Sequence, residues 1–290
     1  MKSRRFVVCA LWGFVAACGG SADGRVTFTT WGESFIEEQI PSDPTGEAGF
    51  VDGWQVTFDK FLVVFAGIEL ADQAGRVAGT MGASLLVDHV QPGRKTLVTF
   101  SDVEARAWDR VSYRIAPPHA TTTGVLTDAA DLAFMSTNGY ALFVEGRATK
   151  AGAAGPIEKS FRWGFSGATL YSRCTQVPEV GLPLEGVVVR AGADESVELT
   201  IHGDHFFYDR LRAAPEGSAP TGLRFEAMAA ADVNADGEVT LEELNATPLD
   251  VRVYDPSGFP VTHLGPFVTS LARTVGHFQG EGECVAGAAP

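Results

Sequence analysis

Apolar positions along this chain recur mainly in short runs with the spacing of β-strands. Clusters of Gly, Pro, Asp and Asn bound stretches rich in Val, Phe, Thr and Tyr, which predicts strands at 25–30, 54–70, 95–100, 111–115, 140–150, 159–170, 186–190, 196–202 and 249–254. Residues 61–65 are apolar throughout, which indicates a strand buried on both faces. Most of the chain is therefore expected to be sheet.

Helical patterns are few. They predict helices at 31–40, 223–231 and 266–278, and another that begins at residue 241. The pattern favours a mainly β fold: an antiparallel β-sandwich formed by residues 25–290 as a single domain, with a small helix–calcium loop–helix insertion at 223–246. A division into two domains near residue 180 is the alternative.

The first residues are typical of an export signal. Basic residues precede an apolar run at 6–14 that is too short to span a membrane. Residues 15–20, Val-Ala-Ala-Cys-Gly-Gly, resemble a bacterial lipobox. The resemblance implies a signal peptide at 1–17, lipid attachment at Cys18 and a tether at 18–24. The lipid anchor implies a place in the bacterial cell envelope, facing the periplasm or the cell surface. An ordinary secretory signal is the alternative, and both place the mature chain outside the cytoplasm.

Two cysteines remain in the predicted mature body once Cys9 has left with the signal and Cys18 carries lipid. In an oxidising compartment Cys174 and Cys284 are expected to form one disulfide. Neither cysteine belongs to a Cys-x-x-Cys pair, which argues against a redox or thiolate-metal role.

The charge balance favours cations as partners. The chain has 22 basic and 36 acidic residues and a formal net charge of −14. Loss of the three basic residues of the signal leaves 19 basic residues and a net charge of −17. This excess of carboxylates disfavours nucleic acid and anionic lipid surfaces as partners.

Residues 232–243 match the twelve-residue calcium loop of an EF-hand. Gly237 occupies the sixth position, where the loop turns with positive φ. Oxygen ligands fall at positions one, three, five, seven, nine and twelve, namely Asp232, Asn234, Asp236, Glu238, Thr240 and Glu243. The alternative is a solvated acidic turn with this spacing by coincidence. Calcium is the predicted ligand.

A second candidate metal site precedes the calcium loop. His202, Asp204 and His205 can converge only if the predicted strand breaks at Gly203, because alternate residues of a strand face opposite sides. Histidine nitrogens with a nearby carboxylate suit zinc or copper, and Asp204 can instead orient a histidine ring. His277 is a possible third nitrogen ligand. The alternative is that these histidines only pack.

Other candidates are weaker. Glu33 and Glu37 share a face of the predicted helix at 31–40, where a solvated face is favoured over a carboxylate site. His89 and His119 are expected to be ordinary surface residues. The sequence contains no Gly-x-Ser-x-Gly elbow, phosphate-binding loop or His-Glu-x-x-His helix.

The lipobox, the early strand and the His-x-Asp-His element before an acidic loop together resemble the periplasmic copper-binding lipoproteins associated with methanobactin systems. Residues 58–70 carry the match along the early strand. The resemblance implies a β-sandwich and copper, or another late transition metal, at His202 and His205. No tryptophan here matches the modified tryptophan of that family.

Three functions remain open at this stage. The favoured one is a calcium-binding, membrane-anchored lipoprotein that binds copper or zinc through its histidines without catalysing a reaction. A metal-dependent enzyme using the same histidines is the second, and a structural or adhesive envelope module braced by calcium is the third. No protein partner is indicated.

Overall fold

The computed structural model describes residues 23–46, 48–178, 181–212 and 221–289. The predicted signal peptide, Cys18 and most of the predicted tether lie outside the described residues, whereas Gly24 already begins the first strand. Across these ranges, no helix has both the length and the apolar character needed to cross a membrane. The fold is mainly β, as the sequence predicts.

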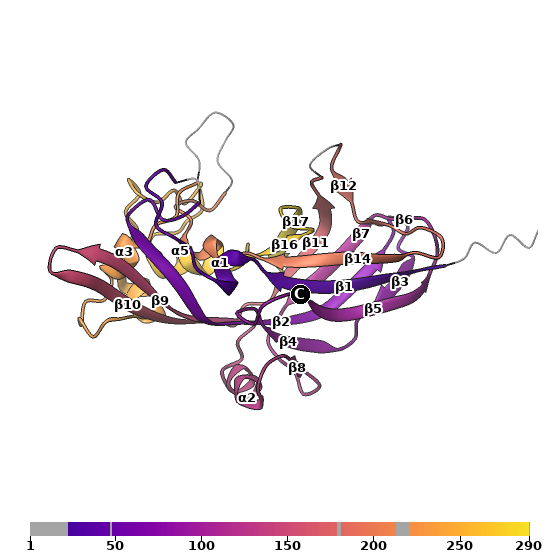
Figure 1. Ribbon diagram of the computed structural model, residues 1–290, viewed down its shortest axis with the longest axis horizontal. Coiled ribbons are helices and arrows are strands. Elements are labelled where there is room, and N and C mark those ends of the chain that lie inside the picture. Colours follow the sequence, from indigo (N-terminus) through magenta and orange to yellow (C-terminus); the bar gives the residue numbers. More distant parts are fainter. Residues whose placement is uncertain (1–22, 47, 179–180, 213–220, 290) are drawn as a thin grey trace, which may run out of the picture.

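The larger of the sheets is built around one long strand, β2, and curls as a half-barrel (Figure 1). Strands β12, β11, β7, β2, β9, β10 and β15 follow one another across it, and β3, β4, β8 and β17 attach to its members. Its strands are β2 (Trp54–Ala71), β3 (Val77–Thr80), β4 (Ser84–Asp88), β7 (Arg110–Ile115), β8 (Thr123–Val125), β9 (Leu142–Gly152), β10 (Gly155–Phe165), β11 (Thr169–Gln176), β12 (Leu184–Glu185), β15 (Glu238–Val239) and β17 (Glu283–Ala288).

A four-stranded sheet carries the candidate site. Its order is β16-β14-β1-β5, and its strands are β1 (Gly24–Gly32), β5 (Lys95–Val103), β14 (Asp194–Ile201) and β16 (Gly276–Phe278). The two sheets share a hydrophobic core in which Phe28 of β1, Phe65 of β2 and Tyr113 of β7 are fully buried. Strands β6 (Ala107–Trp108) and β13 (Val187–Val188) form a small separate pair.

The sheets are mixed, which corrects the prediction of a wholly antiparallel sandwich. Strand β1 runs parallel to β14, β4 parallel to β8, and β10 parallel to β15. Alternation of apolar residues shows which side chains share a face but does not encode the direction of a neighbouring strand. That direction is set by pairings between distant parts of the chain, such as Arg25 with Asp194.

Helices are short and flank the sheets (Figure 1). They are α1 (Ser34–Glu37), α2 (Ala129–Asn138), the 3₁₀ turn η1 (Asp204–Phe207), α3 (Glu226–Ala229), α4 (Leu241–Ala246) and α5 (Leu264–Leu271). The sequence missed α2, which Asp128 caps at its start and which covers Leu62, Val64 and Phe143 of the large sheet.

Several predicted bounds were wrong. The helix at 31–40 shrinks to α1, because β1 continues to Gly32. The helix at 266–278 ends at Leu271 and gives way to β16. The strand at 159–170 is divided between β10 and β11, and 249–254 forms turns instead of a strand.

The predicted disulfide is confirmed. Cys174 in β11 is bonded to Cys284 in β17, across a sequence separation of 110 residues. The bond joins two strands that also pair with each other. It therefore holds the C-terminal strand β17 against β11.

Candidate metal centre

His202 and His277 are brought together by the edge of the four-stranded sheet. Strand β16 lies antiparallel to β14, with His277 opposite Thr200 and Gly276 opposite Ile201. His202 follows directly, and its backbone N–H donates to the carbonyl of Val275 over 2.9 Å. The two imidazole rings are consequently 4.1 Å apart between centroids.

Strand β14 ends before Gly203, and the turn that follows places His205 beside His202 and His277. Strand β14 ends at Ile201 and the 3₁₀ turn begins at Asp204, so the chain turns where the sequence required it to turn. A Cβ atom on residue 203 would lie 2.7 Å from Cγ1 of Ile36 and 2.9 Å from Cε2 of Phe58, which leaves room for glycine alone. The ring of His205 lies 5.5 Å from that of His202 and 4.8 Å from that of His277.

The three histidines form a set suited to one metal ion. One nitrogen from each of His202, His205 and His277 lies within 4.8 Å of the others, and all three residues are buried. Three imidazoles around one point are a ligand set used for zinc and copper. A tetrahedral zinc site requires nitrogens about 3.3 Å apart, as follows from bonds of about 2.0–2.1 Å, so binding would draw the rings slightly closer.

Thr274 fixes the tautomer of His205. Its hydroxyl donates its single proton to the carbonyl of Leu271 over 2.8 Å and lies 2.8 Å from Nδ1 of His205. Because that proton is already used, Nδ1 of His205 must be the donor in the contact. Nε2 therefore keeps its lone pair, and the threonine serves as the outer partner that metal-binding histidines usually have.

Two carboxyl groups, which we call the inner carboxylates, lie beside His202. Oε1 of Glu33, which begins α1, is 3.2 Å from Nδ1 of His202. Asp204 accepts a 3.0 Å hydrogen bond on Oδ2 from the hydroxyl of Tyr208. Glu33, Asp204 and His202 form a second group whose ligand atoms lie within 4.8 Å of one another.

Several polar atoms of the centre are buried without a partner. Nine buried side-chain polar atoms of the described residues have no hydrogen bond, and four of them belong to this centre: Oε1 of Glu33, Nε2 of His202, Oδ1 of Asp204 and Nδ1 of His277. The contact between Glu33 and His202 is close, but its angles are not those of a hydrogen bond. Such atoms are costly in a protein interior, and their concentration at one place is typical of a site that takes a ligand.

Burial sets the protonation of these groups. It lowers the pKa of His277 to about 3, helped by the charge of His202, and lowers the pKa of His205 well below its usual value. Burial, followed by the charge of Asp204, raises the pKa of Glu33 to about 8. His205 and His277 are therefore neutral at pH 7, which is the form that binds metals, while the inner carboxyl groups favour a bound cation or a proton.

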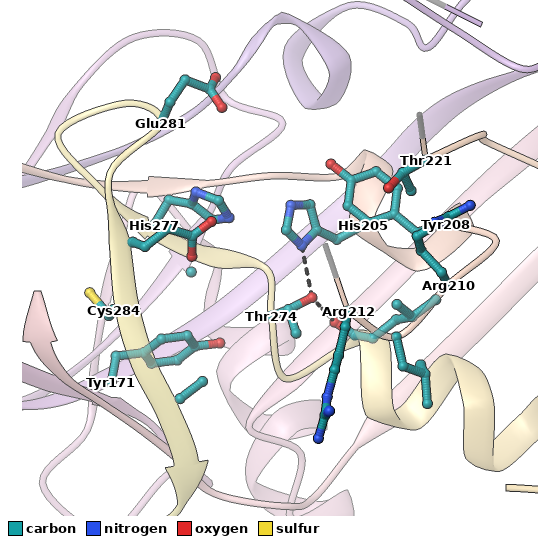
Figure 2. A pocket seen from close by; sticks show the side chains of 15 residues that line it. Tyr171, His205, Tyr208, Arg210, Arg212, Thr221, Thr274, His277, Glu281 and Cys284 are labelled. Atoms are coloured by element: carbon teal, nitrogen blue, oxygen red, sulfur yellow. Dashed lines mark hydrogen bonds between the residues drawn. The ribbon is translucent and has the colours of Figure 1, made fainter. Parts of the chain in front are cut away.

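A cavity of about 550 Å³ opens beside the centre. Figure 2 shows His205 and His277 facing one another along it, with Thr274 hydrogen-bonded to His205 and Glu281 beyond His277. Arg210 and Arg212 line the side away from Glu281. A small molecule in this cavity would therefore contact His205 and His277.

Sequence reasoning missed two features of this region. Glu33 was assigned to a solvated helix face, yet only 19% of its side chain is exposed, because the parallel pairing of β1 with β14 places the residue after β1 beside His202. His89 was expected on the surface, but it is fully buried, with Nε2 2.8 Å from Oγ1 of Thr30. His119 is exposed, as predicted.

The predicted calcium loop lies apart from this centre in the sequence, between α3 and α4. Gly237 has a φ of +88°, as the sixth loop position requires, and residues 238–239 pair with β10. The ammonium group of Lys159 forms an ion pair of 2.5 Å with Asp232, which is the predicted calcium ligand at the first position of the loop. Oε1 of Glu243 is buried and, in the part of the chain that the structure describes, has no hydrogen-bond partner.

Comparisons with protein-family models, with curated proteins and with solved structures yield no match.

Proposed function

We propose that this protein is a transition-metal-binding lipoprotein of the bacterial cell envelope that holds zinc or copper between His202, His205 and His277. The observation that carries the proposal is the set of three buried imidazole nitrogens within 4.8 Å of one another. Thr274 supports it by presenting Nε2 of His205, and the unpartnered atoms of His202 and His277 support it further.

Elemental analysis of the protein, produced without an affinity tag, tests this function. We expect at least about one zinc or copper ion per chain in the wild type. A His202→Ala/His205→Ala double variant is expected to lose that metal. The exposed residue His119 provides the matched control, because His119→Ala removes an imidazole without touching the centre. A wild-type protein without any transition metal, after incubation with zinc and with copper, contradicts the proposal.

Calcium is proposed as a second ligand, at Asp232, Asn234, Asp236, Glu238, Thr240 and Glu243. The positive φ of Gly237 and the unpartnered oxygen of Glu243 support this assignment. We propose a structural role, because extracellular calcium is plentiful and a Kd on the order of 10⁻⁴–10⁻³ M is sufficient there. The lipid anchor at Cys18 completes the proposal, and the disulfide agrees with an oxidising compartment.

A metal-dependent enzyme is the second candidate function, and the cavity beside His205 and His277 favours it. A metal held by three histidines keeps a coordination position for water or substrate, and the cavity would admit that substrate. Hydrolysis of a panel of ester and phosphoester substrates by the metal-loaded protein, absent from the double variant, supports the enzyme. A metal-loaded protein inactive on this panel supports the binding role.

A further inference from the structure

We propose that the centre holds two transition-metal ions that share the imidazole ring of His202. The outer ion lies between His202, His205 and His277, and the inner ion between the other nitrogen of His202, Glu33 and Asp204. This inference rests on the proposed function, because the inner position is completed by a ligand of the outer one.

The ligand atoms divide into two groups. Among the described residues, two sets of three meet the 4.8 Å spacing, and His202 is the member that they share. Atoms bound to one ion by bonds of about 2.0–2.2 Å cannot be more than about 4.4 Å apart. The described residues hold no larger group that meets the 4.8 Å spacing, so one ion serves one set and leaves the other without a cation.

The spacing of Glu33 and His202 is that of two ligands on one ion. Oε1 of Glu33 lies 3.2 Å from Nδ1 of His202, and the contact lacks the geometry of a hydrogen bond. Two ligands with bonds of about 2.0–2.1 Å to a tetrahedral ion lie about 3.3 Å apart. A cation beside this pair explains both the short distance and the absent hydrogen bond.

The two inner carboxyl groups have no lysine or arginine partner. Asp204 is buried, its Oδ1 has no partner, and neither it nor Glu33 forms an ion pair with a lysine or arginine of the described ranges. A buried carboxylate without a counter-charge is strongly destabilising. An ion on Glu33, Asp204 and His202 would supply positive charge at a place where the described structure puts the imidazole of His202 but no lysine or arginine.

The two positions differ in chemistry. The outer set has three nitrogens and suits zinc or copper, whereas the inner set has two oxygens and one nitrogen and suits a divalent ion such as zinc. When both nitrogens of His202 are bound, its ring has released the remaining N–H proton to solvent. Loading of the second ion therefore liberates one proton from His202, balanced by the charge of the ion.

Zinc stoichiometry tests whether His202 bridges two ions, an arrangement that we call the bridge. The full chain is first stripped of metal by a chelator and then dialysed against zinc, with millimolar calcium present to occupy the acidic loop. It is expected to bind about two zinc ions. Glu33→Gln and Asp204→Asn keep the size of each side chain but remove its charge. Each variant is expected to bind about one zinc ion. The exposed Glu38 of the same segment provides the control, since Glu38→Gln should still bind two.

The outcomes separate the two proposals. One zinc ion in the wild type and one in Glu33→Gln overturn the bridge but keep the outer site, while no zinc in the wild type overturns the proposed function itself.

A second measurement needs no variant. Two Cu²⁺ ions on one imidazole lie about 6 Å apart, given metal–nitrogen bonds of about 2 Å. The paramagnetic resonance signal of the first equivalent should therefore diminish as the second equivalent binds. Two independent signals that simply add would overturn the bridge.

Discussion

The hydroxyl of Thr274 lies 2.8 Å from Nδ1 of His205 and, because it donates its own proton to Leu271, it accepts the proton of that ring. The contact leaves the lone pair of Nε2 of His205 free to bind a metal ion. Thr274, which is not itself a proposed metal ligand, thus controls whether His205 can bind a metal together with His202 and His277.

Removal of this hydroxyl is expected to weaken metal binding. Thr274→Val keeps the shape of the side chain but leaves Nδ1 of His205 without an acceptor, and loss of such an outer partner typically costs about 10–100-fold in affinity. Zinc titration against a competing chelator measures the change. Thr274→Ser keeps the hydroxyl and should bind zinc as the wild type does, so equal losses in both variants would contradict the role given to the hydroxyl.

Acid is expected to destabilise the protein through His89. Burial, followed by the charge of Lys95, lowers the pKa of this residue from 6.5 to about 3. Between these two values the unfolded chain takes up a proton that the folded chain refuses, so the free energy of unfolding decreases as the pH falls below about 6.5. The contribution of one such group approaches about 1.4 kcal/mol per pH unit.

Urea unfolding in a chelator at several pH values from 7.5 to 4.5 measures this dependence. His89→Gln removes the titrating group, so its free energy of unfolding should fall less steeply with acid than that of the wild type. His205 and His277 act in the same direction in both proteins, which makes the difference between the slopes the decisive quantity. Identical slopes would contradict the assignment to His89.

Calcium is expected to stabilise the fold through Glu243. With a Kd on the order of 10⁻⁴–10⁻³ M, 10 mM calcium adds about 1.4–2.7 kcal/mol, and Tm should rise by several degrees. Glu243→Gln should abolish this rise while preserving the helix start, because glutamine also completes the capping box with Thr240. The exposed neighbour Glu242 is the control, and a calcium-induced rise in Tm that survives in Glu243→Gln would contradict the ligand assignment.

Lys159 is expected to compete with calcium. Its ammonium group is bonded to Asp232, whose pKa it lowers, and thereby holds a position in which a calcium ligand is needed. Lys159→Met should lower the Tm of the calcium-free protein, since Asp232 loses its counter-charge, and should enlarge the rise that calcium produces. Thermal unfolding with and without calcium measures both effects. An unchanged calcium response would show that the lysine and the ion do not share Asp232.

The sequence predicted the strands better than their arrangement. Strand β2 begins and ends within one residue of its predicted bounds, because its apolar run is long and is bounded by Gly53 and by Asp72. The parallel neighbour of β1 was not foreseen, since no local pattern distinguishes a parallel from an antiparallel partner. Helix α2 was missed because its apolar positions serve a small second cluster outside the main core.

The candidate site was likewise predictable only where its signals are local. His202, Asp204 and His205 stand together in the sequence, and Gly203 marks the bend that gathers them. Glu33 carries no such signal, because a carboxylate at the start of a short helix ordinarily faces water. It joins the centre through strand pairing alone.

The parallel pairing of β1 with β14 has a consequence for the order of events in assembly. The contact between Glu33 and His202 closes a loop of about 170 residues. The conformational entropy of this loop is lost before contacts between its ends can stabilise the fold. A partly synthesised chain therefore has the isolated side chains but no place where they meet. A cation bound at this centre would therefore be taken from the surroundings in which the chain completes its folding, and those surroundings would determine which ion is available to it.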